Sequence, residues 1–274
     1  MSKFLIIGGV AGGATTAARL RRIDEESEII IIERGDYISY ANCGLPYYIG
    51  GTIEKRESLF VQTPESFFKR FNVDVRIKSE VISINRDKKT VTVKESSGKT
   101  YEENYDKLVL SPGAEPIKPM IDGINDPAIF TLRSVPDTDK IKKYINDNRP
   151  TSAIVIGGGF IGLEMAENLH ALGIKVSIVE MADQVMTPVD YEIAAYAHQH
   201  IKTKGVDLFL GDGIASFSRN GNCVSARLAS GREIVSDMII LSIGIKPDTA
   251  FLRTSGINLS DRGAIIVDEF LRTN

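Results

Sequence analysis

The amino-acid sequence predicts an α/β fold that contains one nucleotide-binding layout twice. Residues 3–22 and 152–173 each begin with an apolar β run, continue through a cluster of glycines and end in a helical pattern. Each copy is followed by a second apolar strand that closes on a glutamate, at Glu33 and at Glu180. Short alternating strands lie between the copies. We therefore predict two Rossmann-like units, the second inserted in the first, with a β-meander.

The composition indicates a globular protein with enough apolar mass for two cores. The chain has 274 residues, of which 43% are hydrophobic and 25% are charged. A formal net charge of −3 gives no overall basic field, so nucleic acid is not expected as the main partner. No run approaches the roughly 18 apolar residues of a membrane span. Two cysteines give no disulfide framework, and we predict a cytoplasmic protein with no membrane partner.

The first strand of each copy leads into a glycine-rich turn. Glycine allows the backbone to turn tightly beneath a helix N-terminus, whose free N–H groups and positive dipole end hold a pyrophosphate. The second copy is regular, whereas a valine replaces the middle glycine of the first. The motifs are Gly8-x-Val10-x-x-Gly13 and Gly157-x-Gly159-x-x-Gly162.

The glutamates stand where such a unit places the acid that accepts from ribose hydroxyls. Glu33 lies 20 residues beyond Gly13, and Glu180 lies 18 beyond Gly162, close to the roughly 20 that the fold requires. One glycine motif alone is weak support, because tight turns between a strand and a helix are common. Two copies, each with its strand, helix and distant acid, strongly favour nucleotide binding.

The region between the copies predicts a helix followed by the meander. Thr63 is a plausible N-cap for the helical stretch TPESFFKRF. Four short strands follow, at residues 73–77, 81–86, 89–95 and 99–105. A strand that leaves through Pro and Gly predicts a domain crossing at residues 107–119, and the same form recurs at residues 237–252. The final stretch GAIIVDEFLRTN is interpreted as a strand that returns to the first unit.

Five motifs in this layout resemble the flavin-dependent pyridine nucleotide-disulfide oxidoreductases, and the resemblance covers essentially the whole chain. They are GGVAGGA, SYANCGLPYYIGG, LVLSPGAEP, IGGGFIGLEMAE and GIKPD. The chain is most similar to the single-cysteine branch, in particular to the coenzyme A-disulfide reductase and NADH-dependent persulfide reductase group. The resemblance implies FAD and NADH or NADPH as cofactors. It implies an FAD-binding domain over residues 1–113, an NAD(P)H-binding domain over 114–245 and a return segment over 246–274.

Cys43 is the candidate redox residue. A free cysteine is often a small buried hydrophobe, but ANCGLPYYI is typical of a loop that enters a short helix, where a thiol is more reactive. The glutathione-reductase branch of the family has two cysteines five positions apart, whereas Ile38 and Tyr48 occupy those positions around Cys43. Cys43 therefore has to work with a sulfur from the substrate. By resemblance, electrons pass from NAD(P)H to FAD and then to a mixed disulfide on Cys43.

The resemblance also implies the remaining site residues. Phe160 and Glu164 match positions that gate and orient the nicotinamide, although a core aromatic is an equal reading of Phe160. Glu180 followed by MADQ, with no arginine beside it, favours NADH over NADPH. The implied cofactor residues are Gly8, Val10, Ala11, Gly12, Gly13, Glu33, Arg34, Asn42, Val81, Ser111, Gly113, Arg133, Gly157, Gly159, Phe160, Ile161, Gly162, Glu164, Glu180 and Gly244.

A coenzyme A-type thiol or disulfide is the implied substrate. Its implied contacts are Thr15, Arg19, Arg22, Ser39 and Asn42. Arg19 and Arg22 are neighbours on one helical face, where they can meet ADP phosphates. Coenzyme A-specific members tend to have an amide at the position of Arg19, so the preferred thiol stays open.

Several other residues are interpreted as structural. Cys223 lies in a strand-like stretch, and His170 is a surface helix residue. His198 and His200 are two apart in a helical pattern and so face different directions, and no metal site is predicted. Tyr47 and Tyr48 either pack beside the flavin or belong to a core.

Two alternative functions stay open. A solitary thiol also serves an NADH oxidase or peroxidase that cycles through sulfenic acid. Members of the family continue with a second FAD motif and an interface domain that makes them homodimers, and the sequence given does not include these. We therefore expect weak flavin retention and little turnover from this chain, and a redox-inactive nucleotide-binding module is the second alternative.

Overall fold

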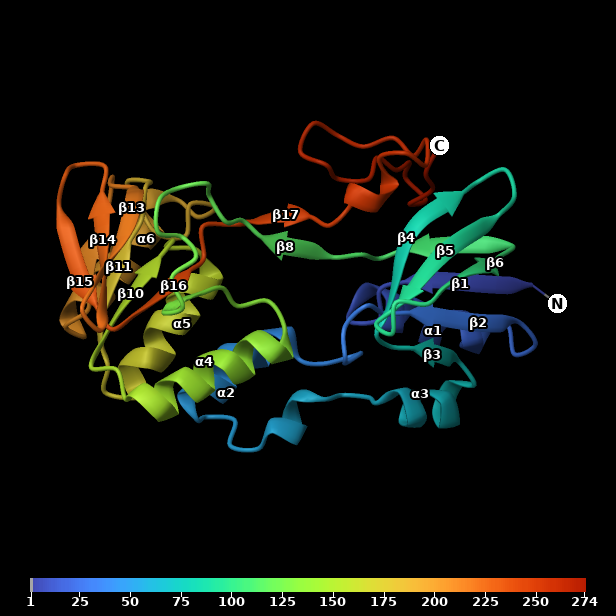
Figure 1. Cartoon of the computed structure of the whole chain (residues 1–274), viewed down its shortest axis with the longest axis horizontal. Coiled ribbons are helices and arrows are strands. Elements are labelled where there is room, and N and C mark those ends of the chain that lie inside the picture. The colour runs from blue at the N-terminus through green and yellow to red at the C-terminus, as the bar shows by residue number, and fades with distance from the viewer. Residues whose placement is uncertain (1) are drawn as a thin grey trace. The chain divides into compact units, whose positions relative to one another are not determined.

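A computed structural model describes residues 2–274 and confirms the mixed α/β fold with parallel sheets (Figure 1). The chain forms two compact units. The first contains the residues up to Ala41, residues 57–115 and residues 246–274, and the second contains residues 42–56 and 116–245. The second unit is thus inserted in the first, as predicted. Residues 42–56 differ from the predicted boundaries, because they pack with the second unit.

The first unit is built on a parallel sheet with the strand order β3-β2-β1-β7. Its elements are β1 (Lys3–Ile7), β2 (Glu28–Ile32), β3 (Asp74–Arg76) and β7 (Lys107–Leu110), with α1 (Gly12–Ile23) and α3 (Pro64–Phe71). The predicted cap of α3 is confirmed, because Thr63 accepts from Ser66 N–H and the Ser66 hydroxyl accepts from Thr63 N–H.

The meander of the first unit has three strands, and the prediction of a fourth at residues 73–77 is wrong. The three are β4 (Ser79–Asn85), β5 (Thr90–Glu95) and β6 (Thr100–Asn104), all antiparallel. β3 instead pairs parallel with β2, with Ile30 opposite Asp74. β3 is an edge strand with one exposed side, so its sequence alternates as a meander strand does.

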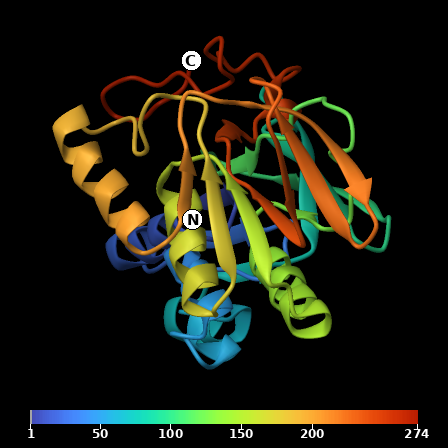
Figure 2. The same cartoon turned by 90° about the vertical axis from the view of Figure 1, so that its left-hand side faces the viewer.

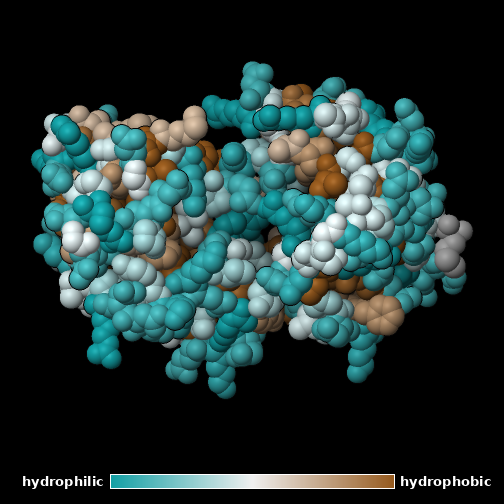
Figure 3. Space-filling model, in the orientation of Figure 1, coloured by the Kyte–Doolittle hydropathy of each residue, from teal (hydrophilic) through white to brown (hydrophobic). Residues whose placement is uncertain are grey.

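The near-continuous apolar runs of β1 and β2 arise because both faces of this sheet are covered. Leu5, Ile7, Ile30 and Ile32 pack against the meander, whereas Ile6, Ile29 and Ile31 pack against α1 and α3. Successive side chains of a strand point to opposite faces, so a helix layer and a meander layer enclose alternate residues. Most of the face drawn in Figure 3 is accordingly hydrophilic.

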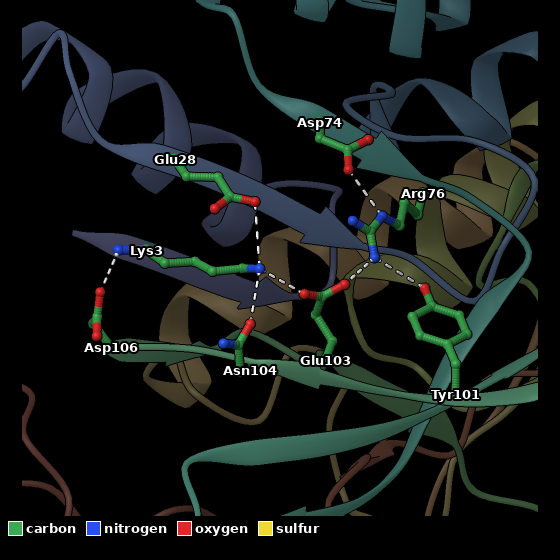
Figure 4. A network of polar contacts seen from close by, with 8 residues as sticks. All are labelled: Lys3, Glu28, Asp74, Arg76, Tyr101, Glu103, Asn104 and Asp106. Atoms are coloured by element: carbon green, nitrogen blue, oxygen red, sulfur yellow. Dashed lines mark hydrogen bonds and ion pairs between the residues drawn. The ribbon is translucent and has the colours of Figure 1, made fainter. Parts of the chain in front are cut away.

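A network of ion pairs joins the meander to the sheet in the first unit (Figure 4). Glu103 of β6 lies between two cations, with its Oε1 2.6 Å from Lys3 Nζ and its Oε2 bonded to Arg76. Arg76 also donates to Asp74, at 2.8 Å, and to the Tyr101 hydroxyl, at 3.2 Å. The Glu103 side chain is only 13% exposed. Lys3 and Arg76 hold its pKa below the usual range, against the effect of burial.

The second unit repeats this architecture on a five-stranded parallel sheet with the order β12-β11-β10-β16-β9 (Figure 2). Its strands are β9 (Ile129–Phe130), β10 (Ser152–Ile156), β11 (Lys175–Val179), β12 (Asp207–Phe209) and β16 (Met238–Leu241). Its helices are α4 (Val135–Asn148), α5 (Phe160–Ala171) and α6 (Tyr191–Thr203).

A second antiparallel meander, which the sequence analysis did not predict, covers one face of this sheet. It consists of β13 (Ile214–Asn220), β14 (Cys223–Leu228) and β15 (Glu233–Ser236). Phe217, Val224 and Leu228 from these strands pack against Ile154 and Ile239 of the sheet. Both units therefore consist of a helix layer, a parallel sheet and a meander.

The two chain crossings follow the predicted Gly and Pro signals. β8 (Ala114–Pro116) and β17 (Ile245–Pro247) pair as a two-stranded sheet. Gly113 and Gly244 precede them with φ of 75° and 125°, a region that favours glycine. Beyond the short helical turn η3 (Ala250–Leu252), the strand expected at residues 263–274 does not form. An isolated bridge joins Leu259 and Ile265, and Ile265 is partly buried against the core of the first unit. The other large apolar residues of this stretch are exposed, namely Ile266, Val267, Phe270 and Leu271.

The remaining elements are two helical turns, η1 (Asn42–Gly44) and η2 (Arg56–Leu59), and the short helix α2 (Leu45–Gly50). Across residues 2–274, no helix has both the length and the apolar character needed to cross a bilayer.

Candidate functional site

The glycine turn of the first unit has a geometry that only glycine permits. Gly8 has φ of +93°, and a Cβ there would lie 2.0 Å from the carbonyl oxygen of Ser111. A Cβ at Gly13 would lie 1.8 Å from the carbonyl oxygen of Gly8. No side chain caps the N-terminus of α1, so its N–H groups are available to an anion. This turn fits the pyrophosphate of a dinucleotide.

The glycine turn of the second unit repeats this arrangement. Gly157 has φ of +107°, and a Cβ at Gly162 would lie 1.9 Å from the carbonyl oxygen of Gly157. At Gly159, by contrast, a Cβ would meet no protein atom within 4 Å. Val10 occupies the corresponding position of the first turn, so the irregular motif departs from glycine only where the protein tolerates a side chain.

Both strand-end glutamates hold the glycine turn beside them through the same pair of hydrogen bonds. Glu33 accepts from Gly9 N–H and from Gly35 N–H, both at 2.7 Å. Glu180 accepts from Gly158 N–H at 2.6 Å and from Ala182 N–H at 2.8 Å. Each carboxylate oxygen has a further lone pair. Both acids can therefore fix the turn and still accept from ribose hydroxyls.

A cavity of about 120 Å³ opens beside the first glutamate, entirely within the first unit. Arg34 Nη1 lies 2.8 Å from Asp248 Oδ2, and the same guanidinium pairs with Glu115. The cavity and the glycine turn together fit the adenosine part of FAD. The lining residues are Ile7, Gly8, Ile32, Glu33, Arg34, Ser79, Glu80, Val81, Pro112, Asp248, Ala250 and Phe251.

The lining contains four predicted cofactor residues, Gly8, Glu33, Arg34 and Val81, and others that the sequence analysis missed. Asp248 is the most informative of the missed residues, because it pairs with Arg34. It is the last residue of the motif GIKPD, of which only Gly244 was predicted as a cofactor residue. The ion pair between Asp248 of the return segment and Arg34 has no local sequence signal.

The residues predicted to bind substrate in the first unit lie along α1 and, for Ser39, beside the glycine turn. Thr15 and Arg19 are exposed on α1, as is Arg22. Ser39 has a left-handed φ of 45°, and its N–H donates to Gly9 O at 3.0 Å. Ser111 N–H donates to Ile7 O at 2.8 Å. The exposed residues Ala11, Gly12 and Gly113 lie at the start of α1 and at the end of the adjacent β7.

The start of α5 carries the residues predicted to contact the nicotinamide. Phe160 is 62% exposed and Ile161 is 42% exposed, so the reading of Phe160 as a core aromatic is wrong. Glu164, one turn further on, has its pKa raised by burial and by the neighbouring Glu167. Arg133 and Gly244 belong to the same unit, before α4 and before β17.

Cys43 is exposed and lies in η1, immediately before α2. This excludes the reading of Cys43 as a small buried hydrophobe. Asn42, also exposed, precedes it. The resemblance led us to expect both residues in the domain of the first glycine turn, but they belong to the second unit.

Packing of α2 explains why residues 42–56 belong to the second unit. Gly50 lies so close to α5 that a Cβ there would be 2.1 Å from Asn168 Oδ1. Lys142 of α4 donates to Tyr48 O at 2.6 Å, and its Nζ lies 4.2 Å from the centre of the Tyr48 ring. Arg56 Nη2 lies 2.7 Å from Asp139 Oδ2. These contacts fix the segment that presents Cys43.

Tyr47 and Tyr48 lie in different environments. Tyr48 is buried, at 9% exposure, and packs with Lys142. Tyr47 is half-buried, and Glu164 raises its pKa, with smaller contributions from burial, Glu167 and Cys43. The surroundings of Tyr47 are therefore electronegative, and they include the sulfur of Cys43.

The second cysteine is structural, as expected. Cys223 begins β14, and its Sγ lies 3.4 Å from Asp237 Oδ1. This hydrogen bond and burial raise the pKa of the Cys223 thiol. Its lower reactivity contrasts with the exposure of Cys43.

The histidines also match their expected placement. His170 is exposed on α5. His198 is buried on α6 whereas His200 is exposed, so the two rings face different environments. The His198 Nε2 accepts from Val185 N–H, a contact that the sequence analysis did not predict.

The fold and both glycine turns agree with the comparison to protein families. Residues 2–274 match the family described as pyridine nucleotide-disulphide oxidoreductase. The chain belongs to this family.

Relatives within the family include proteins named as disulfide and persulfide reductases. The coenzyme A disulfide reductase of Staphylococcus aureus is 37% identical over 275 residues, which cover 100% of this chain and 61% of the relative. The crystal structure of reduced Bacillus anthracis CoADR-RHD matches with 55% identity and a TM-score of 0.95, over 99% of this chain and 49% of that one. A NAD-dependent persulfide reductase from A. fulgidus matches with 35% identity and a TM-score of 0.94, over 99% and 51%. This chain therefore spans about half to three fifths of the length of these relatives.

Proposed function

We propose that the protein is an FAD-dependent NAD(P)H:disulfide oxidoreductase that reduces coenzyme A disulfide, or a related small disulfide or persulfide, through Cys43. The exposure of Cys43 carries this proposal, because a thiol of the family's single-cysteine branch has to reach a sulfur from outside the chain. The names of the S. aureus and A. fulgidus relatives support a disulfide or persulfide as substrate.

The first unit is proposed to hold FAD. Its support is the glycine turn at Gly8–Gly13, the carboxylate of Glu33 and the cavity lined by Arg34 and Val81. Bound FAD supplies a two-electron carrier between NAD(P)H and the disulfide. Ser111 and Gly113 complete the proposed contacts in this unit, together with Val10, Ala11 and Gly12 at the start of α1.

The second unit is proposed to bind NADH. Gly157–Gly162 supply the pyrophosphate site, and Glu180 accepts from the ribose hydroxyls of the adenosine. The residues after Glu180 are Met181, Ala182 and Asp183, with no cation to meet a 2′-phosphate. We expect NADPH to bind more weakly than NADH for this reason. Phe160 and Glu164 are the proposed nicotinamide contacts, with Ile161, Arg133 and Gly244.

Cys43 is proposed to act as the nucleophile in thiol exchange. Its thiolate attacks one sulfur of the substrate disulfide, forms a mixed disulfide with that sulfur and releases the other as a thiolate. Two electrons from NAD(P)H then cleave the mixed disulfide, which frees the second thiol and restores Cys43. Fixing α2 to α4 and α5 positions Cys43 for this exchange.

The substrate is proposed to lie along the exposed face of α1. Arg19 and Arg22 of this face carry the positive charge that ADP phosphates require, and Thr15 and Ser39 add hydroxyl groups. Asn42, next to Cys43, is the fifth proposed contact. We propose a cytoplasmic location for the whole protein, since thiols of this kind stay reduced in the cytoplasm. A homodimer is proposed from the resemblance to the family alone.

Electron acceptors separate this function from its alternatives. NADH oxidation is measured on FAD-supplied protein with coenzyme A disulfide, a persulfide, peroxide or oxygen. We expect a low rate with the first two acceptors, in keeping with the weak flavin retention expected of this chain, and we expect Cys43→Ser to abolish it and Cys223→Ser to preserve it. A rate confined to peroxide or oxygen would show an oxidase or peroxidase. NADH binding without any rate or flavin absorbance would show a redox-inactive binding module.

A further inference from the structure

The turn between β11 and α6, residues 181–190, holds both parts of the second nucleotide site. Met186 N–H donates to Gly158 O at 2.9 Å, within the glycine turn. The side chain of Val185 contacts the same glycine so closely that a Cβ at Gly158 would lie 2.8 Å from Val185 Cγ1. Ala182 N–H donates to Glu180 at 2.8 Å. A displacement of this turn would therefore disturb the pyrophosphate site and the ribose-binding acid together.

The turn depends on His198 for one backbone hydrogen bond. Val185 is fully buried, and its N–H donates to His198 Nε2 at 3.1 Å. His198 lies on α6 and is 8% exposed. A buried N–H without an acceptor is costly, so the Val185 N–H needs the imidazole of His198 as its acceptor. The contact requires Nε2 to be unprotonated and the ring proton to be on Nδ1.

The first unit has the same turn without a histidine. Ser39 occupies the position that Met186 has in the second unit, and the φ angles are 45° at Ser39 and 50° at Met186. The Ser39 N–H donates to Gly9 O at 3.0 Å. Ile38 replaces Val185, and it packs in an apolar cluster with Phe67 of α3. In the first unit, an apolar residue of the neighbouring helix, Phe67, therefore packs against the turn. A histidine in the second unit adds a hydrogen-bond acceptor that packing does not require.

We propose that His198 is a positioning residue for NAD(P)H. By accepting from Val185 N–H, it holds residues 181–190 in the conformation that presents Gly158 and Glu180 to the dinucleotide. This inference rests on the proposed binding of NAD(P)H by the second unit. Protonation of Nε2 would replace the acceptor with a second donor, so acidification is expected to loosen the turn and weaken binding.

The surroundings of His198 keep its imidazole neutral at ordinary pH. Burial lowers its pKa, and Lys202, one turn further along α6, adds a smaller effect in the same direction. The ring of Tyr191 lies edge-on with its centre 6.2 Å away. The 181–190 turn presents the N–H of Val185 to it. The hydrogen bond is therefore intact at neutral pH and lost only in acid.

Two substitutions separate the hydrogen bond from the volume of the ring. His198→Met keeps much of the volume and removes the acceptor, whereas His198→Gln keeps an oxygen that accepts at any pH. Dissociation constants of NADH at neutral pH, and of ADP-ribose from neutral to mildly acidic pH, are measured by calorimetry. For His198→Met we expect about tenfold weaker binding of both ligands, the factor that corresponds to one unmet buried hydrogen bond. For His198→Gln we expect affinity within about twofold of the original at neutral pH.

The pH profile distinguishes a positioning role from a purely structural one. ADP-ribose affinity of the original protein is expected to fall in acid, and that of His198→Gln to stay flat. His200→Met is the matched control, since His200 is exposed on the same helix. Nitrogen-15 spectra of the imidazole provide a reading without ligand, in which Nε2 should be unprotonated at neutral pH. If His198→Met does not fold, the His198→Gln profile and these spectra decide the matter.

Three results would overturn the role of His198. They are unchanged affinity in both variants, equal weakening in both, or a protonated Nε2 at neutral pH. An original protein that binds neither NADH nor ADP-ribose would instead refute the proposed function. The two failures are thus distinguishable.

Discussion

The two nucleotide-binding units use the same hydrogen bonds at the strand-end acid but surround that acid differently. Glu33 is 9% exposed and precedes Arg34, which pairs with Asp248 beside a partly open cavity. Glu180 is half-buried and precedes Met181, which is 78% exposed. A more buried acid fits a cofactor that stays bound, and a more exposed one fits a nucleotide that exchanges at each turnover. The residues beside the same glycine turn thus adapt each copy to a different nucleotide.

The helices that follow the two glycine turns, α1 and α5, also differ in their surroundings. The face of α1 that bears Thr15 and Arg19 is exposed, whereas α5 carries α2 through the close approach of Gly50 and Asn168. One helix is therefore available to a substrate, and the other fixes the segment with Cys43. The predictions that follow test these differences.

The largest effect is expected where a methyl group would collide with backbone. Gly13→Ala and Gly162→Ala each place a Cβ within 2 Å of a carbonyl oxygen, so the helix has to move. We expect each to cost about 3 kcal/mol or more of unfolding free energy, measured by denaturant titration. Gly13→Ala should lose FAD binding, and Gly162→Ala should lose NADH binding.

Gly159→Ala is the matched control for Gly162→Ala. With φ of −76° and open space around its Cβ, it should change stability by less than about 0.5 kcal/mol. It should still weaken NADH binding, because the methyl group stands where the pyrophosphate approaches. Equal stability of Gly159→Ala and Gly162→Ala would contradict this account.

The next effect concerns the support of Cys43. Gly50→Ala is expected to push α2 away from α5 at a cost of about 1–3 kcal/mol, read from denaturant titration. The rate at which iodoacetamide alkylates Cys43 should change with it. Adding Asn168→Ala removes the two atoms nearest to the new methyl group, Oδ1 and Cγ, and should restore part of the stability. A double variant no more stable than Gly50→Ala would argue against this contact.

Replacing either strand-end glutamate by glutamine should have an effect of intermediate size, and each replacement should weaken the binding of a different nucleotide. Glu33→Gln and Glu180→Gln each replace one of two charge-assisted acceptors, at a cost of about 1–2 kcal/mol. The cost should be greater at the more buried Glu33. Glu33→Gln should weaken FAD binding, Glu180→Gln should weaken NADH binding, and calorimetry with each ligand measures both. Loss of both ligands in either variant would mean that the units are not independent.

The smallest effect is acid sensitivity at Asp237, which lies at the starts of β10 and β16 in the second unit. Asp237 accepts from the N–H groups of Thr151 and Ser152, and these bonds hold its pKa below the usual range despite burial. Its contribution is complete above its unfolded pKa near 3.8 and is lost as the pH falls further. Asp237→Asn should cost about 1 kcal/mol at neutral pH and flatten the acid limb of the stability curve. An unchanged acid limb would count against this role.

The sequence predicted what depends on local pattern. Apolar strands, both glycine turns, the Thr63 cap and the Gly and Pro crossings each follow from a few adjacent residues, and the structure shows all of them. The exposure of Cys43 could also be predicted from the sequence, because its neighbours are typical of a loop that enters a helix.

The missed features depend on contacts between distant segments. β3 alternates like a meander strand, and only its pairing with β2 places it in the parallel sheet. The second meander was obscured because its strands carry polar residues on one side, although the Gly221-Asn222 turn signal between β13 and β14 was present. The membership of residues 42–56 is decided by α4 and α5, about 100 residues away in the sequence. Likewise, nothing near His198 in the sequence indicates Val185 as its donor.

The most direct test of the account is the site at which coenzyme A disulfide reacts with the chain. Intact mass and peptide mapping after incubation should show one coenzyme A adduct, on Cys43 and not on Cys223. Subsequent addition of FAD and NADH should remove it. Modification of Cys223 first, or an unmodified Cys43 in a folded protein whose denatured chain reacts at both cysteines, would contradict the central claim.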